Sequence, residues 1–443
     1  MKPIKKIIAG ALALLLLASM AGCTTQPGIK PSASPAQTDT PAAPALAKPL
    51  SMPALETAKP LPTPDYNTAN ASGVGAGAND FAFRLSAALS KKGENMVLSP
   101  FSVWMTLAAL ANATGGNALE QLLTSLDLKG VSVQDINDSV AQMLFTLTNN
   151  EGSEVHDPLA IANAVFVDNT VTLNKEFAQT FLDYYRGAAM NVDFTNGDAI
   201  KAINDWASEH TNGLITDIVK ELPPDAVAAI ANAIYFSDRW VLEFDEGKTE
   251  DMTFHGATSD VQAPFMLREG DGIPYYEDDK LQAVNLQFKT GAVLTILLPR
   301  DGDADALLSG LTAGRFAAIL DGMSEQTGKL LLPRFEVNSD FELTDALTSL
   351  GVPLFDSANP PITGLADSED LFISSSLHQA TIKVDEKGTT AAAVTVQIMS
   401  RTSLALPTEP FSMIADRPFV FVLHQWTPDA GAQVLFTGVV NQL

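Results

Sequence analysis

The sequence predicts an α+β fold, with helices early in the chain and strands concentrated near its end. Residues 80–89 and 101–111 carry apolar side chains at the spacing of an amphipathic helix. Residues 293–298 form the continuous apolar run of a buried strand, and residues 380–385 alternate apolar and polar side chains like a half-buried strand. Two further late strands are predicted at 419–423 and 434–440.

Composition restricts the class of protein. The chain has 443 residues, of which 46% are hydrophobic and 18% charged, so it can form a folded core. Its 27 basic and 52 acidic residues give a formal net charge of −25. We therefore do not expect it to bind nucleic acid or anionic membrane surfaces through its overall charge. The one cysteine, Cys23, excludes an internal disulfide and a cysteine zinc cluster.

Residues 1–22 are predicted to be an export signal. Three lysines near the start precede an apolar run at 7–17, and small residues follow at 18–22. The apolar run is too short for a stable membrane-spanning helix. Ala21-Gly22-Cys23 resembles the signal-peptidase site of bacterial lipoproteins. That resemblance implies a lipid on Cys23 and an exported protein that is anchored to the cell membrane and faces outward.

Residues 23–72 are predicted to be a tether. They contain ten prolines, spread from Pro27 to Pro64 among Ala, Thr and Ser, and a single aromatic residue, Tyr66. Such a segment buries too little surface to fold and stays extended. Residues 73–443 contain no second linker and no internal repeat, so they are predicted to form one domain.

The motifs of the common enzyme classes are missing from the sequence. It has no HExxH, no paired metal-ligand spacing, no glycine-rich phosphate loop and no G-x-S-x-G elbow, and its five histidines are scattered. We therefore predict no metal ion, no cofactor and no enzymatic activity. A carboxylate-pair glycosidase stays open on sequence alone.

A run of small residues follows the strand predicted at 380–385. It consists of Glu386, Lys387, Gly388, Thr389, Thr390, Ala391, Ala392, Ala393, Val394 and Thr395. If the run became a strand, one face would carry only small uncharged side chains, which enter a packed sheet without a large desolvation cost. Gly388 would give the backbone freedom at a hinge. A loop or a short helix is an equally good interpretation of this run by itself.

Seven segments, in order along residues 79–441, resemble motifs of the serpins, the serine-protease-inhibitor family. They are residues 95–102 (NMVLSPFS), 162–167 (ANAVFV), 203–213 (INDWASEHTNG), 232–244 (NAIYFSDRWVLEF), 384–393 (VDEKGTTAAA), 415–420 (ADRPFV) and 436–441 (FTGVVN). The resemblance implies a serpin fold: a large central, mostly antiparallel sheet, a helical half, and an exposed reactive loop that can insert into the sheet.

The resemblance also implies a function. A target protease attacks the reactive loop and forms an acyl-enzyme, and the cut loop then enters the sheet and carries the trapped protease with it. The small-residue run 386–395 matches the hinge of that loop. Ser99, Ser102, Asn232 and His378 match the polar cluster over which the sheet opens. Trp240, Arg334 and Glu386 match the site where insertion begins, with Arg334 as the basic partner of Glu386.

Counting from Glu386 by the family spacing places the reactive bond at Thr402–Ser403, with Arg401–Thr402 as the second choice. Thr402 suits elastase-like or subtilisin-like serine proteases, whereas Arg401 suits trypsin-like ones. Cysteine proteases are a further class of target. We expect a monomer that meets the membrane only through its lipid anchor.

Two alternatives remain at this stage. One is a serpin that binds proteases, or is cleaved by them, without trapping them. The other, more remote, is a solute-binding lipoprotein with two α/β lobes and a ligand cleft, which would not explain the series of motifs.

Overall fold

The computed structural model describes residues 50–64, 73–148, 158–195, 197–211, 213, 215–223, 226–368, 371–389 and 409–443. The predicted signal peptide 1–22, Cys23, the later part of the hinge (390–395) and both candidate reactive bonds at 401–403 lie outside these residues. No helix within the described ranges is long and apolar enough to cross a membrane.

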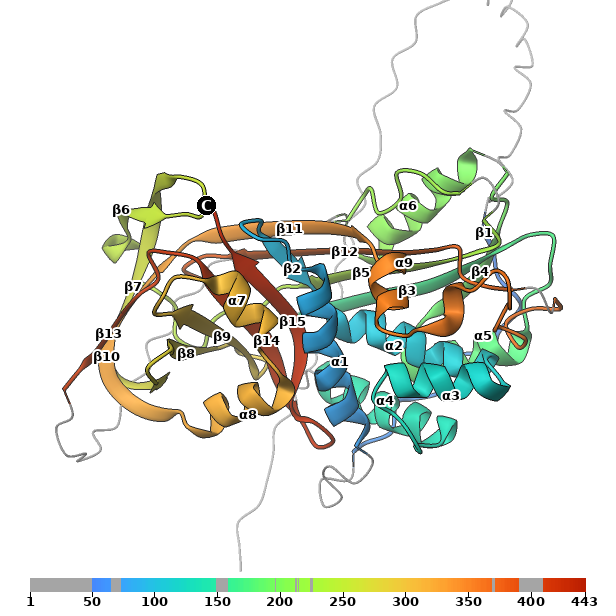
Figure 1. The fold of residues 1–443 in the computed structure, drawn as a ribbon, viewed down its shortest axis with the longest axis horizontal. Helices are drawn as coiled ribbons and strands as arrows, with labels where there is room; N and C mark the ends of the chain where they lie inside the picture. Colours follow the sequence, from blue (N-terminus) through green and yellow to red (C-terminus); the bar gives the residue numbers. More distant parts are fainter. Residues whose placement is uncertain are drawn as a thin grey trace, which may run out of the picture. The chain divides into compact units, whose positions relative to one another are not determined.

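Among the described residues, six helices lie in the first half of the chain and three shorter ones follow. Figure 1 shows their arrangement. In the part that the structure describes they are α1 Val74–Leu89, α2 Pro100–Leu110, α3 Gly116–Ser125, α4 Val133–Thr148, α5 Lys175–Tyr185, α6 Asp198–His210, α7 Ala304–Ser309, α8 Ala313–Asp321 and α9 Thr344–Ser349. Helix α2 begins at Pro100, directly after Ser99, whose Oγ accepts a hydrogen bond from the Ser102 amide. Every residue of α2 is buried, so this helix forms part of the core.

The first sheet, called here sheet A, has six strands among the described residues, in the order β1-β4-β3-β5-β12-β11 (Figure 1). Their bounds are β1 Leu50–Ser51, β3 Leu159–Asp168, β4 Ala188–Val192, β5 Ala228–Phe236, β11 Phe335–Glu342 and β12 Ser375–Val384. The pairs β3·β4 and β5·β12 are parallel, and the other three pairs are antiparallel. Strands β5 and β12 are therefore direct neighbours in the middle of a mixed sheet.

A second sheet, sheet B, has nine strands within the described residues, in the order β13-β10-β7-β8-β9-β14-β15-β2, with β6 paired to β7. Their bounds are β2 Met96–Leu98, β6 Glu250–His255, β7 Asp260–Glu277, β8 Leu281–Gln287, β9 Ala292–Pro299, β10 Ser324–Pro333, β13 Phe411–Ile414, β14 Phe419–Thr427 and β15 Gly431–Val440. Strands β9, β14 and β15 are buried along almost their whole length, as expected for sheet strands that are covered on both faces.

The elements predicted from apolar spacing are confirmed. Residues 80–89 lie in α1, and the helix predicted at 101–111 is α2, which ends one residue earlier. The strands predicted at 293–298, 419–423 and 434–440 lie in β9, β14 and β15. The strand predicted at 380–385 is the end of β12, which stops at Val384.

The prediction of an unfolded tether through residue 72 is wrong for residues 50–64, called here the N-terminal strap. Leu50 and Ser51 pair antiparallel with β4, which makes β1 an edge strand of sheet A. The Glu56 amide donates to Oε1 of Gln179 at 2.8 Å. Composition argued against a core inside this segment, but the strap needs none, because it uses the folded surface of α5 and β4 as its partner.

Asp183 on α5 is the main polar partner of the strap. Its side chain is 2% exposed, lies 3.1 Å from the Lys59 ammonium, and accepts hydrogen bonds from the Lys59 amide and from Gln179. Burial alone would raise the pKa of Asp183, but the hydrogen bonds from Lys59 and Gln179 and the charge of Lys59 outweigh it and lower the pKa.

Replacing Asp183 by Ala is expected to lower the free energy of unfolding by about 1–3 kcal/mol, because it leaves the part-buried donors of Lys59 and Gln179 without an acceptor. Urea unfolding of the full chain measures this loss. The matched control is Asp205→Ala, which removes an exposed carboxylate paired with Lys201 and should change stability by less than about 1 kcal/mol. Equal effects of the two substitutions would contradict a stabilising role for the strap contact.

Candidate functional site

The chain reverses direction directly after β12, in a turn called here the hinge turn (residues 385–389). The Asp385 amide donates to the Gly388 carbonyl at 2.9 Å, and the Asp385 carboxylate accepts from the amides of Lys387 and Gly388. This pattern closes a tight turn whose first residue is held by its own side chain. Within these five residues the chain therefore turns back toward the end of β5.

The hinge turn is paired with the segment that continues β5, called here the holding segment (residues 238–249). Gly388 forms an antiparallel bridge with Arg239. The Trp240 amide donates to the Lys387 carbonyl at 2.9 Å, and the Thr389 amide donates to the Asp238 carbonyl at 2.8 Å. The first residues of the predicted hinge thus already pair antiparallel with the chain that follows β5.

Gly388 is required by this close approach. Its φ is +146°, a backbone conformation that favours glycine, and a Cβ there would lie 2.0 Å from the Asp238 carbonyl oxygen. The backbone freedom predicted for Gly388 is therefore used for a specific backbone contact.

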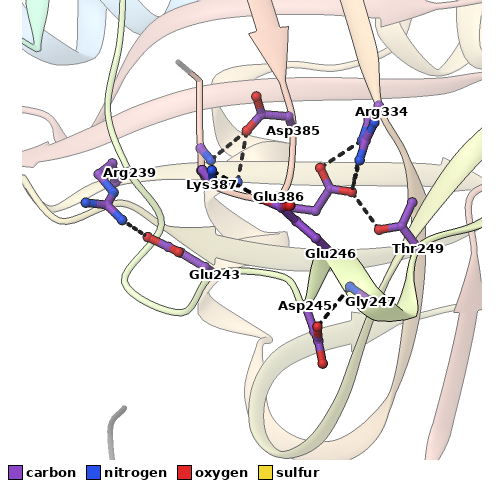
Figure 2. Close-up of polar contacts among 11 residues, drawn as sticks. Arg239, Glu243, Asp245, Glu246, Gly247, Thr249, Arg334, Asp385, Glu386 and Lys387 are labelled. Atoms are coloured by element: carbon purple, nitrogen blue, oxygen red, sulfur yellow. Dashed lines mark hydrogen bonds and ion pairs between the residues drawn. The ribbon is translucent and has the colours of Figure 1, made fainter. Parts of the chain in front are cut away.

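Glu386 points to a basic and a hydroxyl partner (Figure 2). The Arg334 guanidinium makes three hydrogen bonds to its carboxylate, at 2.6–2.9 Å, and Thr249 Oγ1 donates to Oε1 at 2.6 Å. Burial of Glu386 raises its pKa, but the hydrogen bonds from Arg334 and Thr249 outweigh burial and lower the pKa overall. The predicted contact between Arg334 and Glu386 is present, at the junction of β10 and β11.

Trp240 packs the holding segment against the core. Its side chain is fully buried and stacks on Phe288, with ring centroids 4.0 Å apart. The indole Nε1–H donates to the Asp385 carbonyl at 2.9 Å. Four residues later, the Phe244 amide donates to the Glu386 carbonyl at 2.9 Å. Trp240 and Glu386, which the sequence assigned to one site, are therefore brought together.

Thr389 and Asp238 form the innermost contact of the site. Thr389 is 2% exposed, and its Oγ1 accepts a hydrogen bond from the Asp238 amide at 2.7 Å. The Asp238 carboxylate, also buried, accepts from the Thr290 amide at 3.0 Å. Sequence reasoning did not assign Asp238, which lies two residues after the apolar strand β5. Thr249 gave no signal, because 137 residues separate it from Glu386.

Replacing Arg334 by Gln is expected to lower the thermal midpoint, because the Glu386 side chain, 4% exposed, loses its charged partner. Charged hydrogen bonds of this kind are each worth about 1.5–3 kcal/mol. The control is Lys383→Gln on β12, whose pair with Glu336 is 3.7 Å long and exposed on both sides. Calorimetry should show the larger shift for Arg334→Gln, and a shift no larger than that of the control would contradict this assignment.

A second group of buried polar side chains lies under the middle of sheet A, where sequence analysis placed the polar cluster. His378 on β12 and Asn232 on β5 are register partners. The Ser99 amide donates to His378 Nε2 at 3.1 Å, and Ser99 Oγ donates to the Leu435 carbonyl. Asn232 Nδ2 lies 3.4 Å from the Ser102 carbonyl oxygen. The four predicted residues therefore join β5 and β12 to the start of α2.

Two members of this cluster were missed. Asn232 Nδ2 donates at 2.8 Å to Thr106 Oγ1 on α2, and at 3.0 Å to Asn163 Oδ1 on β3. Asn163 is a polar residue inside an apolar strand, within the motif ANAVFV, and that break in the apolar run could have identified it. Thr106 lies on α2, where every residue is buried, so nothing in its local sequence distinguishes it from the core residues beside it.

His378 links this cluster to pH. Burial lowers the pKa of His378 to about 3. A histidine in the unfolded chain takes up its proton near pH 6.5, whereas native His378 stays neutral, so stability is full above about pH 6.5 and falls as the pH drops toward 3. His424, also buried, has its pKa lowered to about 3 and acts in the same direction.

We expect the urea midpoint to fall between about pH 7 and pH 5, and to fall less steeply in a His378→Gln variant, whose side-chain oxygen can still accept from Ser99. Because the variant takes up one proton fewer on unfolding, the change of its unfolding free energy with pH is smaller by up to about 1.36 kcal/mol per pH unit. An unchanged pH dependence in the variant would show that His378 does not supply the effect.

The hinge turn and the polar cluster both connect strands β5 and β12. They lie where β5 and β12 meet, one at the ends of these strands and one beneath them. Among the described residues, no group of three or more His, Cys, Asp or Glu side chains could hold a metal ion. The arrangement holds two neighbouring strands together through hydrogen bonds that must break before the strands can separate.

Sequence comparisons identify related proteins. Residues 76–443 match the profile of the Serpin family, described as serine protease inhibitor. An uncharacterized serpin-like protein of Thermococcus kodakarensis is 32% identical over 355 residues, covering 78% of this chain and 81% of the relative. Serpin-ZXA of Oryza sativa is 32% identical over 392 residues, covering 82% of this chain and 96% of the relative.

A structural comparison agrees with this. The crystal structure of tengpin, a thermophilic serpin in its native state, has a TM-score of 0.74 and 23% sequence identity, and covers 89% of this chain and 98% of tengpin. At this identity the likeness is evidence of a common fold.

Proposed function

Because this chain belongs to the serpin family, whose members are protease inhibitors and not enzymes, and has the serpin fold, we propose that it traps serine endopeptidases as a suicide substrate. Its reactive loop is cut, and the loop then enters sheet A between β5 and β12. Membership of the family rules out the two-lobed solute-binding protein considered from the sequence.

The pairing of β5 with β12 is the observation that carries this proposal. The two strands are parallel neighbours, paired from Ala229 with Ser375 to Tyr235 with Thr381. Gly388 already pairs antiparallel with Arg239, just beyond the end of β5. A strand that continues this pairing between β5 and β12 is antiparallel to both. Insertion replaces one parallel ladder by two antiparallel ladders, which are slightly more stable per residue.

The closed sheet also supports a favourable insertion. His378 Nδ1 and Asn232 Oδ1 are buried and have no hydrogen-bond partner among the described residues. A buried polar atom without a partner costs about 1–3 kcal/mol. Rearrangement of the polar cluster during insertion gives these atoms a chance to find partners.

The chemistry before insertion belongs to the target protease. Its serine oxygen attacks the carbonyl carbon of Thr402, the bond to the Ser403 nitrogen breaks, and Ser403 leaves as a new amino terminus. The protease stays esterified to Thr402. About fourteen inserted residues at about 3.3 Å each then move it by roughly 45 Å. Arg401–Thr402 is the alternative bond.

For its location we propose export and attachment to the bacterial membrane through a lipid on Cys23, with the domain facing outward. The basic start, the apolar run and Ala21-Gly22-Cys23 support this. Labelling expressed protein with a radioactive fatty acid, beside a Cys23→Ser variant, tests it. Equal labelling of the two proteins would overturn the anchor.

The proposed function is tested by mixing the full chain with pancreatic elastase, subtilisin and trypsin. We expect a complex that survives denaturing electrophoresis with at least one of them. The mass of the released C-terminal peptide then identifies Thr402 or Arg401 as the residue before the cut. Cleavage by all three enzymes without any complex would favour the alternative, a serpin that is cut without trapping.

Replacing Thr389 by Arg is expected to convert the inhibitor into a substrate. Thr389 is buried against Asp238, and a guanidinium at this position must be desolvated when the sheet closes around the loop, at a cost of several kcal/mol. Denaturing gels should show cleavage with little or no complex. Thr389→Ser, which keeps the hydroxyl, is the control and should trap like the wild type. Stable complexes of Thr389→Arg at wild-type yield would refute insertion at this residue.

A further inference from the structure

A hollow of about 620 Å³ lies beside the holding segment. The holding segment contributes Val241, Leu242, Glu243, Asp245 and Lys248 to its wall. Strand β7 contributes residues 267–274, and β8 and β9 contribute Asn285, Gln287 and Val293. Neither the hinge nor the polar cluster uses this hollow.

Arg268 on β7 is the unusual residue in this wall. Its Nη2 atom is buried and has no hydrogen-bond partner among the described residues. Burial lowers the pKa of Arg268 to about 10, so the side chain stays charged at neutral pH. Its guanidinium carbon lies 4.7 Å from the centre of the Phe244 ring, which stabilises the cation but accepts no conventional hydrogen bond. A partly buried cation with a buried, unpartnered donor normally has a hydrogen-bond acceptor or an anionic partner.

The rest of the wall has a large apolar component. Leu242 is 51% exposed, an uncommon exposure for a leucine in this chain, and it borders the hollow. Leu267, Ile273, Pro274 and Val293 add further apolar surface. A ligand that fits this wall needs an apolar body in addition to an anionic group.

The charges at the rim restrict the anion. Glu243 is paired with Arg239, and Glu269 is paired with Lys248 at 3.0 Å. Asp245, Asp271 and Glu325 add three more carboxylates to the lining. These acids repel a multiply charged group such as phosphate much more strongly than a single carboxylate.

We propose that Arg268 is the anion-binding group of a site for a small monocarboxylate with an apolar body. The carboxylate bonds to the guanidinium, and the apolar body lies against Leu242 and Ile273. The bound ligand supplies the hydrogen-bond acceptor that Arg268 lacks and covers the exposed Leu242 side chain.

The site is also connected to the hinge, and this step rests on the proposed function. The Arg268 guanidinium packs against the Phe244 ring, and the Phe244 amide donates a hydrogen bond to the Glu386 carbonyl. A ligand that fixes Arg268 therefore stabilises the holding segment in the position where it binds the hinge turn. Because it favours the closed sheet, the ligand slows loop insertion.

The binding test uses octanoate as the probe and octanamide, its uncharged analogue, as the control ligand. Calorimetry on the full chain should show saturable binding of octanoate and binding of octanamide weaker by about tenfold or more. The affinity of Arg268→Gln for octanoate should also be about tenfold or more weaker than that of the wild type. Arg268→Lys keeps the charge and should bind octanoate like the wild type. Arg300→Gln removes a half-exposed arginine elsewhere on sheet B and should bind like the wild type.

No saturable heat with octanoate, or equal affinity in wild type and Arg268→Gln, overturns the proposal. If Arg268→Gln does not fold, Leu242→Ser takes its place and should weaken octanoate while leaving the guanidinium intact. The link to the hinge is measured separately, as a larger fraction of cleaved, untrapped protein when octanoate is present during the protease reaction. If no protease is trapped even without octanoate, the proposed function fails, and the calorimetry still decides the binding site.

Discussion

The parallel pairing of β5 with β12 is the constraint on which the rest of the structure depends. It places two long strands side by side whose chain continuations meet at one end of sheet A. Because the strands are parallel, a third strand arriving by a tight turn from β12 is antiparallel to both. The hinge turn, the holding segment and the polar cluster all lie along the boundary between β5 and β12, called here the seam.

The two ends of the seam are held by different physics. At the hinge turn, backbone pairing and a carboxylate bound by Arg334 and Thr249 fix the chain. Under the sheet, Asn232, His378 and their partners are buried, and some of their polar atoms find no partner. The first arrangement is well satisfied and defines where a loop enters. The second is under-satisfied, and that favours a rearranged state.

The N-terminal strap and Arg268 show that surfaces away from the seam are also built for partners. Asp183 is buried yet bound, because the strap supplies its cation and donors. Arg268 is partly exposed, but its Nη2 atom is buried and unpartnered among the described residues, next to the segment that holds the hinge. The contrast between the two residues is what makes the hollow at Arg268 a candidate for an external ligand.

The sequence by itself determined the class of fold, the main helices and strands, and most of the residues of both sites, since apolar periodicity and short motifs are local properties of the chain. It also predicted the contact between Arg334 and Glu386 through the family resemblance. Asp183, Thr249 and Thr106 could not be found in this way, because their partners lie far along the chain. Arg268 could not be found because its Nη2 atom is buried only after distant segments have packed together. Only the tertiary structure decided that residues 50–64 dock, and that the chain beyond β12 already pairs with Asp238 and Arg239. Both depend on surfaces that exist only after distant segments have packed together.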